Sequence, residues 1–301
     1  MGTPDFSVPT LEKLYSDKSI EIDYVVTKID TKSNRGQKIN FSQVKTKAIE
    51  LGLKVLQPVK IKDDREVIDL LKESNPDYII VVAYGQILSK EILDIPKKAC
   101  INGHASLLPK YRGASPIQSA ILNGDSVTGT TSMLMDVGLD TGDILEQNEV
   151  TIDVKETSDS LFEKLSYLTA DTIHHTIHNF DNINRVKQDD TRATKSMIIK
   201  KEFGKINFEN ETKIDIDRKV RAYTSWPSAY IDFENEQLKI WDVDILEDNI
   251  DIKDLKEISK NLYIYNDSIV AKCKDGFLKI NELQKSGKKR MKSKDFINGI
   301  K

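Results

Sequence analysis

Short apolar segments alternate with amphipathic segments through the first two-thirds of the chain, and this alternation limits the possible folds more than any other feature. The run Tyr78–Val82 (YIIVV) is apolar throughout, which is typical of a strand buried on both faces. Asp63–Ser74 instead places Val67, Leu70 and Leu71 on one side of a helix. This alternation predicts an α/β domain with a doubly wound, mostly parallel sheet. We expect further strands at Glu21–Thr27, Lys54–Leu56 and Ala99–His104, and further helices at Val8–Leu14, Ser42–Leu51, Pro116–Asn123 and Ser158–Ile177.

The pattern changes after the last of these helices. Residues 181–205 are polar, with repeated Asp and Asn, and are typical of a linker. From Ile206 onward, short strands at close spacing predict a small β-barrel, and Asp275-Gly276 is a hairpin-turn signal. The sequence therefore predicts an α/β domain over residues 1–180, a linker over 181–205 and a barrel domain over 206–301. The expected strands of the barrel are Ala229–Phe233, Leu238–Leu246, Leu262–Tyr265, Ser268–Lys272 and Leu278–Leu283.

Composition and charge exclude several classes of protein. Among the 301 residues, 45 Lys and Arg stand against 48 Asp and Glu, so any contact with nucleic acid must come from a local patch. No run approaches the ~20 apolar residues of a membrane span, and no signal peptide opens the chain. The two cysteines, Cys100 and Cys273, are far apart, which excludes a disulfide scaffold and a cysteine-based zinc site. These features predict a cytoplasmic protein that does not contact a membrane.

The segment Ala99–Pro109 (ACINGHASLLP) is the most informative for chemistry. Asn102 and His104 are two residues apart at the end of a predicted strand, so their side chains leave the same face. The carboxyl end of such a strand is where open α/β sheets bind ligands. An amide donor beside an imidazole suits acyl transfer, because the amide binds a developing oxyanion and the imidazole exchanges a proton. The alternative is an ordinary Asn-Gly turn with a packed histidine.

A second segment, Met135–Asp143 (MDVGLDTGD), strengthens the catalytic interpretation. Gly138 and Gly142 bracket Asp140, which indicates a tight loop that fixes the direction of the carboxylate. A carboxylate near an imidazole stabilises the imidazolium and selects its tautomer. Asp-Thr-Gly also occurs in aspartic proteases, but those need a second carboxylate loop in an all-β setting. A β-turn with a structural Asp is the remaining alternative.

Taken together, these motifs resemble the folate-dependent formyltransferases. The matching stretches cover essentially the whole chain: Met1–Phe6 (MGTPDF), Val82–Leu88 (VAYGQIL), Asn102–Ile117 (NGHASLLPKYRGASPI), Gly138–Asp143 (GLDTGD) and Arg221–Tyr230 (RAYTSWPSAY). The resemblance is strongest to the members that act on methionyl initiator tRNA. It implies a Rossmann-like formyltransferase domain followed by an OB-like tRNA-binding domain, acting as a monomer.

The resemblance also implies an activity and its residues. The enzyme would transfer a formyl group from 10-formyltetrahydrofolate to the α-amine of methionyl initiator tRNA, giving N-formylmethionyl-tRNA for translation initiation, without a metal. Asn102, His104 and Asp140 match the catalytic triad. In this mechanism Asn102 and protonated His104 stabilise the oxyanion, and Asp140 holds His104 in its charged form. The residues matched to the folate site are Ala83, Tyr84, Gly85, Gln86, Ile87 and Leu88, acting through backbone groups, and Ser106, Leu107, Leu108 and Pro109.

Two basic stretches are candidates for binding tRNA. Residues 28–47 hold six Lys and Arg against one acid, Asp30, and the resemblance matches Arg35 and Lys38 to a loop that meets the acceptor stem. Residues 272–294 are also basic and include Lys288, Lys289 and Arg290. Such residues supply salt-dependent affinity through phosphate contacts. The alternative for both stretches is a solvated surface.

Two other features are interpreted as structural. His174 and His178 lie on one face of a predicted helix, as a metal pair needs, but no third ligand is evident in the sequence. The sequence therefore predicts no metal site. Trp226, beside Pro227, is expected in the core of the barrel rather than as a base-stacking platform.

The chain departs from the family in two places. Family members have an apolar strand before the segment that matches Met1–Phe6, so we expect the true start to lie upstream and a chain starting at Met1 to fold poorly or lose activity. Gly103 stands where members often have Val, and we expect it to loosen the catalytic strand.

Other functions remain open from the sequence. One is a formyltransferase for another acceptor, either an amino-sugar nucleotide or glycinamide ribonucleotide. The basic loop and the barrel argue against glycinamide ribonucleotide. Another is an RNA-binding relative with impaired catalysis. A deformylating hydrolase, with water in place of the amine, is the most distant alternative.

Overall fold

The computed structural model describes residues 1–32, 39–246, 250–251, 253 and 255–300. Contacts divide the chain into two compact units. The first contains residues 1–116, 127–151 and 162–196, and the second contains residues 117–126, 152–161 and 197–301. The expected boundaries, at 180 and 206, differ because two short segments of the first two-thirds pack with the C-terminal part and because residues 181–196 pack within the first unit.

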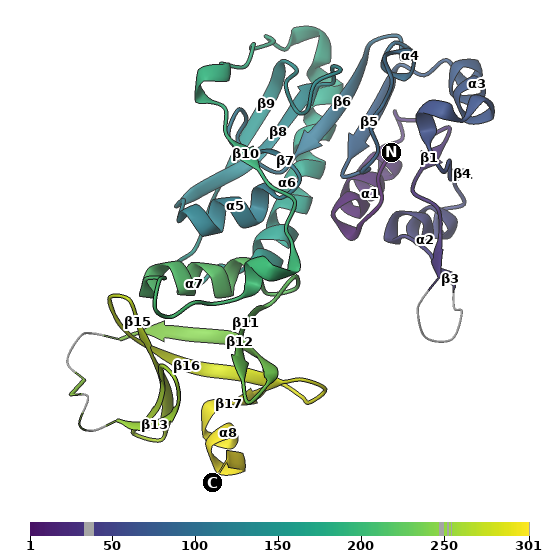
Figure 1. Ribbon diagram of the computed structural model, residues 1–301. Coiled ribbons are helices and arrows are strands. Elements are labelled where there is room, and N and C mark those ends of the chain that lie inside the picture. The colour runs from purple at the N-terminus through teal and green to yellow at the C-terminus, as the bar shows by residue number, and fades with distance from the viewer. Residues whose placement is uncertain (33–38, 247–249, 252, 254, 301) are drawn as a thin grey trace. The chain divides into compact units, whose positions relative to one another are not determined.

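The first unit is an α/β structure whose central sheet has the strand order β5-β6-β8-β9 (Figure 1). The pair β5–β6 is parallel, whereas β6–β8 and β8–β9 are antiparallel. The α/β class is confirmed, but this sheet is mixed rather than mostly parallel, because Val127–Leu134 and Ile144–Thr151 form a hairpin that the sequence analysis did not predict. The strands are β5 (Tyr78–Val82), β6 (Ala99–His104), β8 (Val127–Leu134) and β9 (Ile144–Thr151).

The remaining elements of this unit pack around the sheet or form small pairs of their own. A separate parallel pair joins β1 to β4, β7 pairs with β10, and β2 pairs with β3. The short strands are β1 (Val25–Val26), β2 (Thr31–Lys32), β3 (Ile39–Asn40), β4 (Val55–Leu56), β7 (Arg112–Gly113) and β10 (Lys195–Ser196). The helices are α1 (Val8–Ser16), α2 (Gln43–Glu50), α3 (Arg65–Ser74), α4 (Lys90–Leu93) and α6 (Ser158–Asn179), whose first turn belongs to the second unit.

Local chemistry explains where the helices begin. The Ser42 side chain accepts a hydrogen bond from the Lys45 N–H at 3.1 Å and caps α2, as the sequence predicts. Asp64 caps α3 in the same way through Val67. The apolar stripe of α3 then packs on Ile79 and Val81 of β5. These short-range signals are why the predicted helix boundaries lie within two residues of those observed.

Between β1 and β5 the structure contains a cavity of about 520 Å³. Residues of both strands line it, including Val25, Val26, Ile79 and Ile80. Among the described residues, backbone hydrogen bonds connect β1 with β5 through Met1 and Gly2: the Gly2 N–H donates to the Val26 carbonyl at 3.0 Å, and the Val82 N–H donates to the Met1 carbonyl at 2.9 Å. The two parts of the sheet are therefore linked at one end and separated along the rest of β5 by the cavity.

The second unit is an antiparallel half-barrel with the strand order β11-β12-β16-β15-β14-β13, with β17 paired to β16. This confirms the small β-barrel domain that the sequence predicts. Its core includes Ile231, Leu278 and Phe296. The strands are β11 (Ala229–Phe233), β12 (Glu236–Ile245), β13 (Lys256–Ser259), β14 (Leu262–Tyr265), β15 (Ser268–Cys273), β16 (Gly276–Lys285) and β17 (Met291–Lys292), and the helices are α5 (Pro116–Asn123), α7 (Lys213–Ala222) and α8 (Ser293–Ile300).

The prediction that Trp226 lies in the barrel core is wrong, because the residue is 56% exposed. Tyr223, three positions earlier at the end of α7, is buried instead. A second tryptophan, Trp241 on β12, is partly buried and donates from its indole N–H to Gln284 at 3.0 Å. In the part of the chain described by the structure, no helix combines the length and apolar character needed to cross a membrane.

Candidate active site

The site is built on the last residues of β6. Successive side chains of a strand point to opposite faces, so Asn102 and His104 share one face and Gly103 lies on the other. A Cβ built on Gly103 meets the Thr169 Cγ2 of α6 at 2.6 Å. The glycine therefore lets α6 approach the sheet closely, which leaves Asn102 and His104 on the face opposite the helix. Gly103 therefore has a packing role in addition to the looser strand that the sequence predicts.

His104 is held between a backbone carbonyl and a carboxylate. It is 7% exposed, its Nε2 lies 3.0 Å from the Tyr111 carbonyl, and its Nδ1 lies 3.7 Å from Asp140 Oδ2. The second distance is too long for a direct hydrogen bond but suits an ion pair when the ring is protonated. The structure thus brings together His104 and Asp140, which are 36 positions apart in the sequence.

The loop that carries Asp140 is tightly closed, as its glycines predict. Asp136 accepts hydrogen bonds from the Gly138 N–H at 2.9 Å and from the Thr141 hydroxyl at 2.7 Å. Asp140 itself has a φ of +54°, and its Oδ2 accepts a hydrogen bond from the Gly113 N–H at 2.8 Å. Left-handed backbone at a residue other than glycine is costly and is often found at functional sites. These contacts fix the carboxylate before any substrate binds.

Gln188 and Arg112 support this loop, and the sequence analysis did not identify either. The Gln188 amide donates to the carbonyls of Asp140 at 2.9 Å and Gly142 at 2.7 Å, and its oxygen accepts two hydrogen bonds from Arg112. Gln188 is only 6% exposed. It lies within the stretch expected to be a linker, whose polar composition gives no sign of a buried side chain. Nothing in its neighbouring sequence could have revealed this role.

The loop after β6 is ordered by hydrogen bonds that use its own polar groups. The hydroxyl of Ser106, which is fully buried, donates to the Lys110 carbonyl at 2.6 Å. The Leu108 N–H donates to the Thr131 hydroxyl at 3.1 Å, and the Leu108 carbonyl accepts from Gln147 at 2.9 Å. Leu108 is buried, whereas Leu107 and Pro109 are partly exposed. Of the four residues that the resemblance matches to the folate site here, Leu107 and Pro109 have partly exposed side chains, and Ser106 and Leu108 are buried.

The loop after β5 also contains both buried and exposed residues among those matched to the folate site. Tyr84 and Leu88 belong to the hydrophobic core, and burial raises the pKa of the Tyr84 hydroxyl. Ala83 and Gly85 are exposed, and Ile87 is 82% exposed. Gln86 accepts a hydrogen bond from the Ile61 N–H at 2.9 Å. Because β5 and β6 are parallel neighbours, the two loops emerge at the same edge of the sheet.

The predicted tRNA-binding residues fall into two groups. Arg35 and Lys38 lie outside the described residues. Lys288, Lys289 and Arg290 are exposed in the turn between β16 and β17. Arg290 pairs with Glu282, and its guanidinium lies 5.2 Å from the centre of the Trp241 ring. The barrel therefore presents a basic turn beside a partly buried aromatic ring.

Two family models match nearly the whole chain. Residues 1–177 match the formyl transferase model, and residues 198–301 match the model of the formyl transferase C-terminal domain. The methionyl-tRNA formyltransferase of Clostridium tetani (strain Massachusetts / E88) is 42% identical over 305 residues, which covers 100% of this chain and 96% of the relative. That of Clostridium acetobutylicum is 43% identical and covers 99% of this chain and 95% of the relative.

Solved structures agree on the fold. The sugar 3N-formyltransferase WlaRD, determined with dTDP and 5-N-formyl-THF, superposes with a TM-score of 0.67. It is 22% identical, and the match covers 96% of this chain and 97% of WlaRD.

Proposed function

We propose a mechanism and a tRNA-binding surface for this chain, which belongs to the methionyl-tRNA formyltransferase family and forms N-formylmethionyl-tRNA with a folate donor. The observation that carries the mechanism is the pairing of His104 with Asp140 beside Asn102 at the carboxyl end of β6. We take 10-formyltetrahydrofolate as the donor.

The reaction is addition of an amine to a formyl group followed by loss of the folate nitrogen. The methionyl amine forms a bond to the formyl carbon, and the carbonyl oxygen becomes an oxyanion. The Asn102 amide and an N–H of protonated His104 donate hydrogen bonds to that oxyanion, each worth on the order of 3 kcal/mol in a preorganised site. Collapse breaks the bond to the folate nitrogen, which receives the proton that the amine loses.

The two ring nitrogens of His104 then have different tasks. Nε2–H donates to the Tyr111 carbonyl and fixes the ring, while Nδ1–H faces Asp140 without a direct hydrogen bond. Nδ1–H makes no direct hydrogen bond to a protein group and is therefore the N–H proposed to donate to the oxyanion, with the ring staying in place. The Asp140 carboxylate, held by the Gly113 N–H, stabilises the positive ring and guides a water that carries the amine proton. The amide, imidazole and carboxylate supply the donors and the proton path, so the proposal includes no metal in the transfer step.

The folate ring is proposed to lie at the shared edge of β5 and β6. Because Tyr84 and Leu88 are buried in the core, the loop Ala83–Leu88 contacts the ring through its backbone. Ile87, which is 82% exposed, and Leu107 supply apolar surface that a flat ring would cover. The hydroxyl of Ser106 holds its own loop in shape rather than reaching the ring.

The tRNA is proposed to contact the basic turn Lys285–Arg290 of the barrel, with Arg35 and Lys38 at a second contact. Lys288, Lys289 and Arg290 are exposed and can reach phosphates, at the loss of the contacts that Arg290 makes with Glu282 and with the Trp241 ring. We propose that the enzyme acts as a monomer in the cytoplasm, where its aminoacyl-tRNA substrate is made.

One assay tests the mechanism. The protein is mixed with 10-formyltetrahydrofolate and methionyl initiator tRNA, and formylmethionyl-tRNA is measured on an acid gel. His104→Ala should lower kcat by about 10²–10³-fold, whereas His175→Ala, a matched change at an exposed histidine, should leave the rate unchanged. A His104→Ala rate near that of the wild type would refute the mechanism. An amino-sugar nucleotide offered as acceptor should give no product.

The tRNA surface is tested by salt dependence. Lys288→Ala/Lys289→Ala should raise the KM for tRNA and leave kcat unchanged. It should also reduce the slope of log affinity against log salt concentration by about two, one for each phosphate contact. Lys260→Ala, which removes an exposed lysine paired with Glu209 in the same unit, is the control. An equal slope in the double variant and the wild type would place the tRNA elsewhere.

A further inference from the structure

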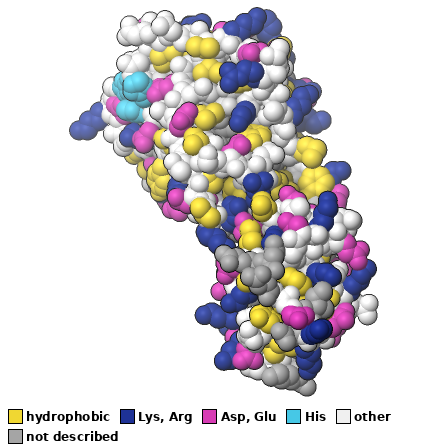
Figure 2. Space-filling model, turned by 90° about the vertical axis from the view of Figure 1, so that its left-hand side faces the viewer, with side chains coloured by type: hydrophobic (Ala, Val, Ile, Leu, Met, Phe, Trp, Pro, Cys, Tyr) yellow, Lys and Arg dark blue, Asp and Glu magenta, His cyan; other side chains and the backbone are white. Residues whose placement is uncertain are grey.

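Three side chains outside the active site converge on one point of the surface. Figure 2 shows histidine side chains gathered on one face of the molecule, and His174 and His178 lie one turn apart near the end of α6. The structure supplies the third group that the sequence analysis did not find. It is Asp17, the residue that follows α1.

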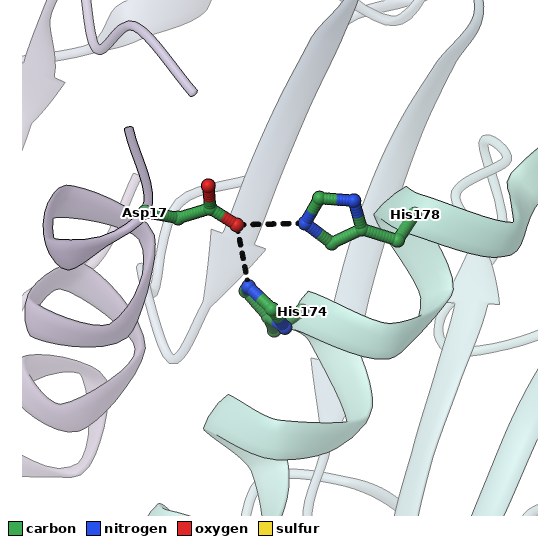
Figure 3. A group of neighbouring side chains, drawn as sticks. All are labelled: Asp17, His174 and His178. Carbon is green, nitrogen blue, oxygen red and sulfur yellow. Dashed lines mark hydrogen bonds and ion pairs between the residues drawn. The ribbon is translucent and has the colours of Figure 1, made fainter. Parts of the chain in front are cut away.

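The donor atoms of the three residues are already close. The Nε2 atoms of His174 and His178 each lie 2.7 Å from the same oxygen, Asp17 Oδ2, as Figure 3 shows. One ligand atom from each residue lies within 4.8 Å of the other two. Two imidazole nitrogens and one carboxylate oxygen form a donor set that Zn²⁺ commonly takes, with water in the remaining position.

We propose that Asp17, His174 and His178 bind one Zn²⁺ ion, or another late first-row divalent cation, outside the catalytic site. With metal–ligand bonds of about 2.0 Å in a tetrahedral site, the ligand atoms stand about 3.3 Å apart. Each nitrogen must therefore move about 0.6 Å away from Oδ2. The side chains of Asp17, His174 and His178 are 21%, 27% and 42% exposed, which leaves them room for this small shift.

The carboxylate is also oriented as a ligand requires. Its other oxygen, Oδ1, accepts hydrogen bonds from the N–H of Ser19 at 2.8 Å and from the Ser19 hydroxyl at 2.7 Å. Oδ2 is thereby left pointing at the two imidazoles. Hydrogen bonds from neighbouring residues to the ligand side chains orient the ligands in this way in known metal sites. The cation replaces the two N–H···O contacts, since each Nε2 must be unprotonated to coordinate it.

The donor set decides which ions bind. Two neutral imidazoles favour Zn²⁺, Co²⁺, Ni²⁺ and Cu²⁺ over Mg²⁺ and Ca²⁺, which prefer a full shell of oxygen ligands. One carboxylate in a partly exposed site does not offset the cost of removing water from Mg²⁺ or Ca²⁺. We therefore expect binding of the first group only.

The position of the ion gives it a structural role. It would join the end of α1 to the last turns of α6, where Lys13 and Asp171 already form an ion pair at 3.0 Å. Leu14, Ser19 and Ile177, which neighbour the three ligands in sequence, line the cavity beside β1 and β5. The ion would therefore link two helices next to this cavity.

The test uses full-length protein without a histidine tag, freed of metal and titrated with Zn²⁺ and with Co²⁺. We expect one Zn²⁺ per chain, the visible absorption of tetrahedral Co²⁺, and a thermal unfolding midpoint that rises with Zn²⁺ and not with Mg²⁺. Asp17→Asn and His178→Ala should each weaken Zn²⁺ binding by about tenfold or more and remove the Co²⁺ bands.

His175→Ala is the matched control, because His175 lies between the ligands on the same helix but pairs with Glu146 instead. It should bind Zn²⁺ as the wild type does. The metal-free melting curves of all variants are compared first, so that a folding defect is recognised separately. Equal Zn²⁺ affinity in the wild type and His178→Ala would overturn the proposal, as would an equal loss in His175→Ala.

Discussion

Gly103 shows how one missing side chain positions its two neighbours. Gly103 packs against α6 with no room for a Cβ atom. A Cβ at this position would lie 2.6 Å from Thr169 Cγ2 and 3.3 Å from Ile173 Cγ1. Thr169 is fully buried, and its hydroxyl lies 2.9 Å from that of Thr130 on β8. The helix, the sheet and the residues of β6 that carry Asn102 and His104 are therefore coupled through this contact.

Replacing Gly103 with Val should destabilise the protein by about 1–3 kcal/mol, because overpacking forces α6 or β6 to move. Activity should fall as well, since Asn102 and His104 are carried on the displaced strand. Adding Thr169→Ala should recover part of the loss by making room. Chemical denaturation and the formylation assay measure the two effects, and a Gly103→Val protein as stable as the wild type would contradict the packing argument.

Gln188 is the second residue whose role depends on contacts from distant parts of the chain. Gln188→Ala removes the amide that donates to the carbonyls of Asp140 and Gly142. It also removes one of the acceptors of Arg112, which keeps its pair with Asp190. We expect kcat to fall about tenfold or more, because a small displacement of the carboxylate is costly, with little change in the KM for folate. The matched change Gln57→Ala, in the loop after β4, should leave kcat unchanged. A KM effect without a kcat effect would show that Gln188 does not position the triad.

At the scale of the elements, buried strands govern the chemistry of the two cysteines. Cys100 on β6 and Cys273 on β15 are 4% and 6% exposed, and burial raises the pKa of each thiol to about 12. A thiol loses its proton only as pH approaches its pKa, so at pH 8 about one in 10⁴ is the reactive thiolate.

We therefore expect neither cysteine to react with a disulfide reagent at pH 8 in the native protein. Both should react within minutes in denaturant, where the thiol pKa returns to its ordinary range. Absorbance of the released thiolate follows the reaction. Rapid labelling of one native cysteine would show that its strand opens readily, and mass spectrometry of the labelled peptide would identify which strand it is.

At the scale of the whole molecule, the cavity between β1 and β5 leaves part of the first unit unfilled. Met1 and Gly2 already make parallel-strand contacts there, with Gly2 opposite Val82. A chain extended before Met1 in the same direction would run along β5 toward Tyr78 and fill the space of about 520 Å³. Apolar residues placed there would be removed from water and would give β1 and β5 a shared neighbour.

An extension of about five apolar, β-branched residues should raise the unfolding midpoint by about 5 °C or more. A Gly-Ser extension of the same length is the control and should have no such effect. Thermal melts of the three proteins, followed by circular dichroism, make the comparison. Equal midpoints for all three would show that the cavity does not accept a strand.

The sequence alone determined several elements that depend on neighbours along the chain, although it missed the hairpin of β8 and β9. The strands Tyr78–Val82, Ala99–His104 and Ala229–Phe233 and the cap at Ser42 match the structure, because periodicity and capping act over a few residues. The family resemblance also predicted Asn102, His104 and Asp140 as catalytic residues, which stays a prediction. The matching family models and relatives show the family and its activity.

Only the tertiary structure decided what depends on residues far apart in the chain. It placed Asp140 3.7 Å from His104, Gln188 against the loop of Asp140, and Asp17 beside two histidines more than 150 positions away. It also showed that Gly103 admits α6 and that Trp226 is exposed. A single sequence carries no local signal for such contacts, because each partner is an ordinary polar or small residue until folding brings the other to it.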